Sequence, residues 1–269
     1  MSTDLQKRQL EATGKVELLP SALSLFGAIS LEDMNGAALM DRVDTKYIFC
    51  LKKMPFLLSW LTKSYRVLTV GENTSTTYES VYFDTENFQL YRQHHCGKLN
   101  RYKIRYRHYV ENDLSFFEIK RKTNTGRTIK HRIPGHESQG LQAGAKEFLE
   151  AKTNLRATDI QPVLWVKYKR ITLVNCSGRE RITLDTAIHF KNRQGSELAF
   201  PLVVAEVKQN KSRRSEFIEL MNTNNIHQGF MSKYCFGISR LEPGLKKNNF
   251  SLSLRKFTKL QSDAVRELD

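Results

Sequence analysis

Polar and apolar positions alternate most clearly between residues 100 and 133 of the chain. In residues 101–107 a basic side chain occupies every second position, with Tyr or Ile between them. Successive side chains of a β-strand point to opposite faces, so this pattern predicts a strand with one cationic and one apolar face. Residues 116–122 and 128–133 repeat the pattern after turn-forming residues such as Asp113 and Gly126. Three adjacent strands are therefore expected to gather cations on one side.

A solvated outer face is the ordinary explanation for such alternation, because antiparallel sheets often keep one face in water. An ordinary wet face mixes charge signs, since like charges directly opposite one another destabilise a sheet. On these three strands only Glu118 stands against many Lys and Arg side chains. The pattern therefore favours a surface that binds a polyanion.

The rest of the chain predicts a mixture of strands and helices. Alternation predicts further strands at residues 41–49, 78–84, 162–175, 179–190 and 202–208. Helical spacing of apolar residues predicts helices at residues 21–26, 31–40, 52–64, 137–152 and 231–240, and a short helix or turn at 87–95. Ser212 or Ser215 is expected to cap one more helix, which runs to about residue 225.

These elements predict an α+β fold. A strand count near eight, with one basic and one apolar face on most strands, suggests an eight-stranded antiparallel β-barrel tunnel with a cationic lumen and helices packed on the outside. We expect a polar N-terminal segment over residues 1–19, a single domain over 20–243, and a basic tail over 244–269 that is either disordered or a surface helix.

Charge and composition narrow the function. The formal net charge is +15, which points to nucleic acid, anionic lipid or a phosphorylated small molecule as partner. Nucleic acid is disfavoured because the basic residues alternate along strands with few exposed aromatic partners for base stacking. The four cysteines form no CxxC pair, so neither a zinc site nor a disulfide framework is indicated. The first twenty residues lack an apolar signal core. We expect a cytoplasmic protein, and we leave open an association with the inner face of the membrane through a membrane-protein partner, as well as the oligomeric state.

Several short motifs occur along the chain in one order. They are Arg42-x-Asp44-x-Lys46-Tyr47, Tyr82-Phe83-Asp84-Thr85, Arg101-x-Lys103-x-Arg105-x-Arg107, Glu118-x-Lys120, Arg127-x-x-Lys130, Tyr168-x-Arg170, Arg181-Ile-Thr183-Leu-Asp185, Ala205-Glu206-Val207-Lys208 and Ser232-Lys233-Tyr234. This series resembles the VTC domain, the polyphosphate polymerase domain of the vacuolar transporter chaperone complex, and most of all its stand-alone bacterial form. The VTC domain belongs to the triphosphate tunnel metalloenzymes.

The resemblance implies a tunnel enzyme that transfers the γ-phosphate of ATP to a growing polyphosphate chain with the help of a divalent cation, Mn²⁺ or Mg²⁺. It implies catalytic phosphate ligands at Lys46, Arg105, Arg107, Lys120, Lys130, Arg170 and Arg181. Further contacts to ATP, triphosphate or polyphosphate are expected from Lys103, Tyr168, Lys208 and Lys233, and the metal ligand is expected to be Glu206. For Asp185 we favour a structural salt bridge to a tunnel arginine.

One departure from the wider superfamily bears on the reaction. Its hydrolase branches begin with a Glu-x-Glu-x-Lys strand whose carboxylates hold metal, whereas this chain has Arg42, Asp44 and Lys46. The difference favours a phosphotransferase. A metal-dependent triphosphatase or polyphosphatase in the same tunnel, and a non-catalytic polyphosphate-binding module, stay open as alternatives.

Overall fold

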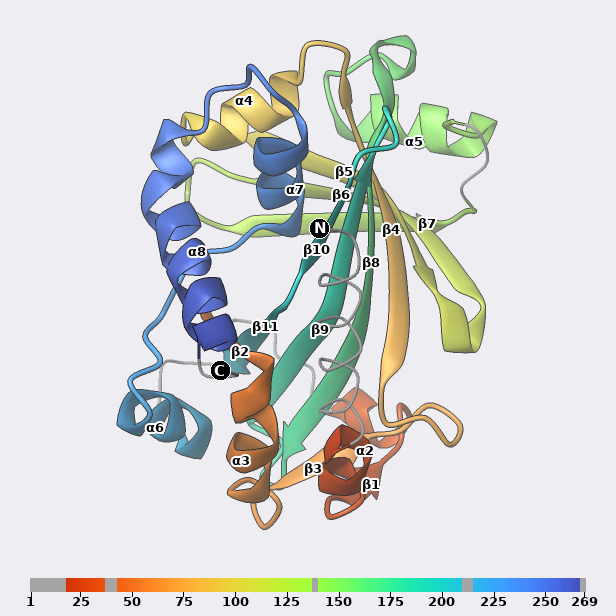
Figure 1. Cartoon of the computed structure of the whole chain (residues 1–269). Coiled ribbons are helices and arrows are strands. Elements are labelled where there is room, and N and C mark those ends of the chain that lie inside the picture. The colour runs from red at the N-terminus through yellow and green to blue at the C-terminus, as the bar shows by residue number, and fades with distance from the viewer. Residues whose placement is uncertain (1–17, 37–42, 137–139, 210–214, 267–269) are drawn as a thin grey trace.

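The computed structural model describes residues 18–36, 43–136, 140–209 and 215–266, and every structural statement below concerns these residues. The fold is mixed α+β (Figure 1). Its strands are β1 (Gly27–Ile29), β2 (Val43–Cys50), β3 (Tyr65–Leu68), β4 (Thr76–Thr85), β5 (Arg101–Tyr109), β6 (Leu114–Lys122), β7 (Thr128–Pro134), β8 (Ile160–Asn175), β9 (Glu180–Asn192), β10 (Glu197–Phe200) and β11 (Leu202–Gln209).

Helices of two kinds surround the sheet. The α-helices are α2 (Leu18–Leu23), α3 (Met54–Ser59), α4 (Gln89–His95), α5 (Ala143–Lys152), α6 (Glu216–Thr223), α7 (Lys233–Leu241) and α8 (Ser251–Arg266). Short 3-10 helices are η1 (Asp33–Gly36), η2 (Leu51–Lys53), η3 (Val110–Asn112), η4 (Ala157–Asp159) and η5 (Asn248–Phe250). None of the described helices combines the length and the apolar composition that a membrane crossing needs.

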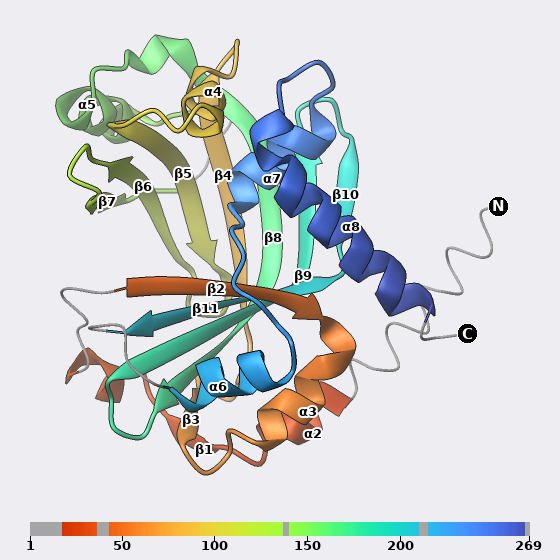
Figure 2. The same ribbon diagram turned by 90° about the vertical axis from the view of Figure 1, so that its left-hand side faces the viewer.

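All the strands join one largely antiparallel sheet of eleven strands. Its main path runs β2-β11-β9-β8-β4-β5-β6-β7, and β1, β3 and β10 pair at its margins. The sheet is strongly curved, and Figure 2 shows β2 and β11 crossing beneath β5, β6 and β7.

The predicted closed barrel is wrong, because the sheet does not close. Within the described residues β2 pairs only with β11 and β7 only with β6, so the two ends of the path stay unpaired with each other. Lys120 of β6 and Lys46 of β2 already repel each other across the concavity, and this repulsion opposes a closer approach of the two ends of the sheet. The eight-strand path itself matches the predicted strand count.

Other sequence predictions differ from the structure mainly at element ends. The helix expected over 52–64 is shorter, and the helix expected over 137–152 is seen as α5, with residues 137–139 outside the described part. Of the helix expected over 31–40, the described residues form only the 3-10 turn η1, and residues 37–40 lie outside the described part. The short strands β1, β3 and β10 were not predicted. Ser215 caps α6 as expected, because its hydroxyl accepts a hydrogen bond from the amide of Ile218. The predictions for residues 1–17, for Arg42 and for Ser212 lie outside the described residues.

Two of the three hydrophobic clusters lie on the outer face of the sheet. One cluster packs the outward side chains of β2, β11, β9 and β8 against α2, α3 and α6, with Tyr47, Leu184 and Ala205 among its members. Another packs the outward side chains of β4, β5 and β6 against α5, with Ile104 and Phe117 at its centre. These apolar residues alternate with the cations, so their burial turns the cations toward the concave side.

The remaining cluster lies on the concave side and was not predicted. Helix α7 inserts Tyr234, Phe236 and Ile238 against inward residues of β8, β9 and β11. A methyl group at Gly237 would lie 2.7 Å from Leu164 and 2.8 Å from Phe190, so glycine permits this close approach. Helix α8 covers α7 from outside through Phe257, whose ring centroid lies 5.8 Å from that of Phe236. One end of the concave side is therefore apolar and filled, and the cations line the rest.

Candidate functional site

The inward face of the sheet brings cations from both halves of the curve together. Lys103, Lys120 and Lys130 lie opposite one another on β5, β6 and β7. On the other half, Lys46 of β2 lies opposite Glu206 of β11. Lys120 interacts electrostatically with both Lys46 and Glu206, so the two halves face each other across the concavity. We call this set of inward charged side chains the cationic face.

Glu118 joins two cations of this face. Arg105 donates hydrogen bonds to one Glu118 carboxylate oxygen from Nε at 2.8 Å and from Nη2 at 2.6 Å, and Lys130 forms an ion pair with the other oxygen. Burial alone would raise the pKa of Glu118, but the charges of Arg105, Arg107 and Lys130 outweigh it and lower that pKa to about 2. The carboxylate stays ionised and fixes the guanidinium of Arg105.

Asp185 plays the same part for a second pair of cations. Arg170 donates from Nε to Oδ1 at 2.6 Å and from Nη2 to Oδ2 at 2.8 Å, and Lys233 also donates to Oδ2. The predicted salt bridge of Asp185 to a tunnel arginine is therefore confirmed. Burial opposes ionisation, but Arg170 and Lys233 hold the pKa of Asp185 well below its usual range.

Tyr168 forms an aromatic wall beside this pair. Its ring is buried and stacks on Tyr78 with the centroids 5.2 Å apart. The Lys233 ammonium lies 4.3 Å from the Tyr168 centroid and the Arg170 guanidinium carbon 5.3 Å from it. Cations over aromatic faces are stabilised without neutralisation of their charge. Within the described residues the buried Tyr168 hydroxyl has no hydrogen-bond partner, which makes it a candidate donor to a phosphate oxygen.

Three lysines of the cationic face differ because no ion pair to a carboxylate is found for them within the described residues. Lys46 donates to the carbonyl oxygen of Met231 at 3.1 Å, and Lys103 donates to the hydroxyl of Ser232 at 2.9 Å. Lys120 stays accessible to solvent, and desolvation together with repulsion by Lys103 and Lys46 lowers its pKa to about 8. Their charge is left for a ligand to neutralise.

Arg107 and Tyr82 complete the inner wall on β4 and β5. Arg107 is buried, donates from Nε to the Ser80 hydroxyl at 3.2 Å, and lies with its guanidinium carbon 5.4 Å from the ring centroid of Tyr78. Arg105 donates from Nη1 to the Tyr82 hydroxyl at 3.0 Å. Burial would raise the pKa of Tyr82, but Arg105 and Arg107 lower it to about 8.

Glu206 is the candidate metal ligand. It lies on the inward face, where the Lys208 ammonium of the same strand lies 3.0 Å from its carboxylate. Burial would raise the pKa of Glu206, but the charges of Lys208 and Lys46 outweigh burial and lower that pKa. Directly opposite on β9, the buried hydroxyl of Thr183 has no hydrogen-bond partner in the part of the chain that the structure describes. These two oxygen donors suit a hard divalent cation that takes its other ligands from phosphate. Within the described residues no group of three or more His, Cys, Asp and Glu side chains could hold a metal ion by itself.

The sequence-predicted set thus comes together on one surface. Arg181 is half-buried and lies opposite Lys208. It shares its face with Asp185, because Ile182 and Leu184 of the same strand point to the other face, into the outer hydrophobic cluster. Asp44, whose role was left open, lies opposite Lys208 at the exposed end of β2 rather than opposite Glu206.

Sequence reasoning gave no role to Asp84 and missed the part that α7 plays. The buried Asp84 carboxylate accepts hydrogen bonds from the amides of Leu90 and Tyr91, at 2.8 and 2.9 Å, and from the Tyr234 hydroxyl. It thereby anchors α7, whose N-terminal end presents Ser232 and Lys233 to the cationic face. The sequence held part of this information, because each of the two residues stands beside a residue of the site. Asp84 lies two residues after Tyr82, and Tyr234 directly follows Lys233.

Comparisons with known proteins were made on the whole chain. Among solved structures, a protein from Bacillus halodurans described as a candidate adenylate cyclase aligns with a TM-score of 0.49 and 16% identity over 75% of this chain and 97% of that chain. HpAC1 from Hippeastrum, described with a dominant triphosphatase activity, aligns with a TM-score of 0.46 and 13% identity over 76% and 98% of the two chains. A comparison with curated proteins gave no match.

The family comparison is more decisive. The profile of the VTC domain matches residues 41–242. This segment contains the whole cationic face, from Lys46 on β2 to Lys233 at the start of α7. The chain therefore belongs to the VTC domain family.

Proposed function

We propose that this protein is a polyphosphate polymerase that transfers the γ-phosphate of ATP to the end of a polyphosphate chain on the cationic face. Membership of the VTC domain family supports an enzyme that acts on triphosphate compounds. The observation that carries the proposal is the set formed by Lys46, Lys103 and Lys120, for which no ion pair to a carboxylate is found within the described residues and which has Glu206, itself paired with Lys208, as its nearest opposite charge. Such a set needs a polyanion, and a phosphate chain has no sequence to be read.

Phosphoryl transfer asks the protein mainly for positioning and charge stabilisation. In the proposed reaction a terminal oxygen of the acceptor chain attacks the γ-phosphorus, the bond from that phosphorus to the β–γ bridging oxygen breaks, and ADP leaves. Arg105 and Arg107 supply planar guanidinium forks that bind phosphate oxygens in pairs, while the lysines act as point charges. Positions 103 to 107 span about 13 Å of strand, so the face can hold several phosphates in a row.

Glu118 and Asp185 serve this reaction by keeping the cations in place. Each carboxylate is buried, with an exposed fraction of 2% and 3%, and each holds two cations at fixed positions. A guanidinium that is already oriented has less to reorganise when negative charge develops on the phosphate in the transition state. Glu118 and Asp185 are thus positioning residues that act through Arg105 and Arg170.

A divalent cation, Mn²⁺ or Mg²⁺, would be held by Glu206 together with the Thr183 hydroxyl and phosphate oxygens. When bound, it would draw negative charge from the phosphate whose bond breaks. Glu206 is paired with Lys208, so that ion pair must loosen as the cation binds.

The decisive experiment incubates the purified protein with ATP and Mn²⁺ and follows long-chain polyphosphate and free phosphate separately. We expect polyphosphate as the main product. Free phosphate without polyphosphate would show a hydrolase on the same face, and tight tripolyphosphate binding without either product would show a binding module.

A matched pair of variants ties the activity to the cationic face. Lys103→Gln removes one of the lysines that has no carboxylate partner, and Lys152→Gln removes an exposed charge from α5. We expect the first to lose product formation and the second to keep it. Equal activity in both variants would refute the assignment of the face.

A further inference from the structure

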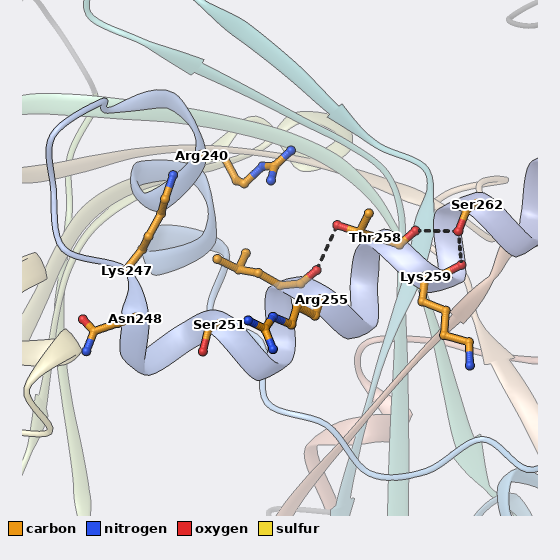
Figure 3. Close-up of a pocket in the computed structure, with 9 residues that line it drawn as sticks. Arg240, Lys247, Asn248, Ser251, Arg255, Thr258, Lys259 and Ser262 are labelled. Carbon is orange, nitrogen blue, oxygen red and sulfur yellow. Dashed lines mark hydrogen bonds between the residues drawn. The ribbon is translucent and has the colours of Figure 1, made fainter.

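A second basic site lies outside the sheet, on the surface that α7, η5 and α8 form together. A cavity of about 540 Å³ opens to solvent there (Figure 3). Four of its lining side chains are cations, namely Arg240, Lys247, Arg255 and Lys259. We call this cavity the basic groove. Apart from Arg240, its lining residues follow the segment that matches the family profile.

Helix α8 has an apolar face that packs on the protein and a polar face that lines the groove. Phe257 is buried in the inner hydrophobic cluster and orients the helix. Thr258 and Lys259 follow Arg255 by three and four residues, and Ser262 follows these two by four and three, so the four residues share a face and line the groove. Lys256 points elsewhere and donates to the carbonyl oxygen of His227 at 3.3 Å.

Among the side chains that the structure describes, no carboxylate neutralises the cations of the basic groove. No acidic side chain lines the cavity, and within the described residues none of the four cations forms an ion pair. The nearby Glu242 is buried and accepts a hydrogen bond from Asn192 at 3.0 Å. The hydroxyls of Thr258 and Ser262 donate to backbone carbonyls of α8, so the charges of the groove are carried by its Arg and Lys side chains.

The geometry points to a ligand with several phosphates and no base. Arg255 and Lys259 lie about 6 Å apart along the axis of α8, and Arg240 and Lys247 stand on separate elements, so a single phosphate cannot reach all four. No aromatic side chain lines the groove for a base to stack on. The groove is shallow and open, and its four cations lie on α7, on α8 and on the segment between them, an arrangement that a flexible chain can follow.

We propose that the basic groove is a second anion site that binds a polyphosphate chain outside the cationic face. The site is separate from the reacting atoms, because α7 lies between them, with Lys233 at one end facing the sheet and Arg240 at the other lining the groove. The proposal concerns binding alone and goes beyond the proposed catalysis.

The test isolates the groove in the full-length protein. Lys103→Gln/Lys120→Gln weakens the cationic face, and Arg255→Gln/Lys259→Gln is then added to remove two groove charges. The matched control adds Lys53→Gln/Lys152→Gln, two exposed charges on η2 and α5, so that the net charge is equal. Calorimetry at low salt measures binding of long-chain polyphosphate, and thermal melts check that all variants fold.

We expect the cationic-face variant to keep binding the long chain, and the added groove substitutions to weaken that binding at least about tenfold. The control substitutions should weaken it by no more than about twofold, because they change only the general field of the protein. Equal losses in groove and control variants would overturn the proposal.

A vesicle-binding experiment tests the other explanation, that the groove binds anionic lipid. Vesicles of phosphatidylcholine and phosphatidylglycerol are sedimented with each variant. If the groove substitutions abolish vesicle binding but leave polyphosphate binding unchanged, the groove is a membrane site and the proposal is overturned. Because no step measures turnover, the result is independent of whether the protein makes polyphosphate.

Discussion

Replacement of Glu118 by Gln tests how the cationic face is held together. In the native protein one carboxylate, 2% exposed, binds the guanidinium of Arg105 and the ammonium of Lys130. Gln keeps the size of the side chain and one acceptor oxygen but removes the charge. The variant therefore leaves two cations beside each other with no counter-charge.

The size of the effect follows from the pKa of Glu118. Folding lowers that pKa from 4.5 to about 2, which corresponds to about 3–4 kcal/mol of stability. Removal of one partner from a buried ion pair costs about 3–5 kcal/mol, which agrees. We expect Glu118→Gln to lower the free energy of unfolding near neutral pH by about 3 kcal/mol.

Urea unfolding as a function of pH measures how much stability Glu118→Gln loses and tests whether the lost charge is the cause. Because the folded-state pKa is lowered, the stabilisation by Glu118 is fully present above pH 4.5 and is lost as the pH falls toward about 2. The difference between wild type and variant should therefore shrink over that interval. Glu147→Gln, an exposed change on α5, is the control and should be neutral. A variant as stable as the control, or a difference that does not depend on pH, would refute the reasoning.

Three further predictions test other parts of the site. Glu206→Gln should keep tripolyphosphate binding but lose metal-dependent turnover by at least about a hundredfold; near-normal turnover across a Mn²⁺ titration would exclude Glu206 as the metal ligand. Tripolyphosphate affinity should fall as the pH rises through about 8, because Lys120 loses its charge and Tyr82 gains one; calorimetry of Lys120→Arg/Tyr82→Phe should show a flatter profile, and an unchanged slope would contradict the assignment. Tyr234→Phe should cost about 1–3 kcal/mol in urea unfolding, because buried Asp84 loses a hydrogen-bond donor, whereas Tyr109→Phe should have little effect, and equal losses in the two variants would count against this role.

The cationic face could be predicted from the sequence because its signal is local. Alternation along residues 101–107 places Arg105 and Arg107 on one face whatever the strand pairs with, and the structure shows this parity. The pairing of Asp185 with Arg170 was also accessible, since a carboxylate among cations needs a partner.

Closure of the sheet and the place of α7 depend on contacts between distant segments. Whether β2 meets β7 depends on the path of the strands between them, and alternation within either strand does not contain that information. The apolar residues Tyr234, Phe236 and Ile238 predict a buried helix, but not that it lies within the concave side of the sheet. The small strands β1 and β3 are too short for the alternation to be distinctive.

The carboxylates are distributed unevenly over the cationic face, so one part of it attracts anions more strongly than the rest. Glu118 and Asp185 each offset part of the charge of two cations, whereas Lys46 and Lys103 donate their hydrogen bonds to neutral groups, the carbonyl of Met231 and the hydroxyl of Ser232. These two groups lie just before α7, whose N-terminal end adds a partial positive charge of its own. Attraction for an anion is therefore greatest where α7 enters the concavity. A triphosphate that binds there would have its most highly charged end at Lys46 and Lys103, and the paired cations Arg105 and Arg170 would hold the phosphates that follow.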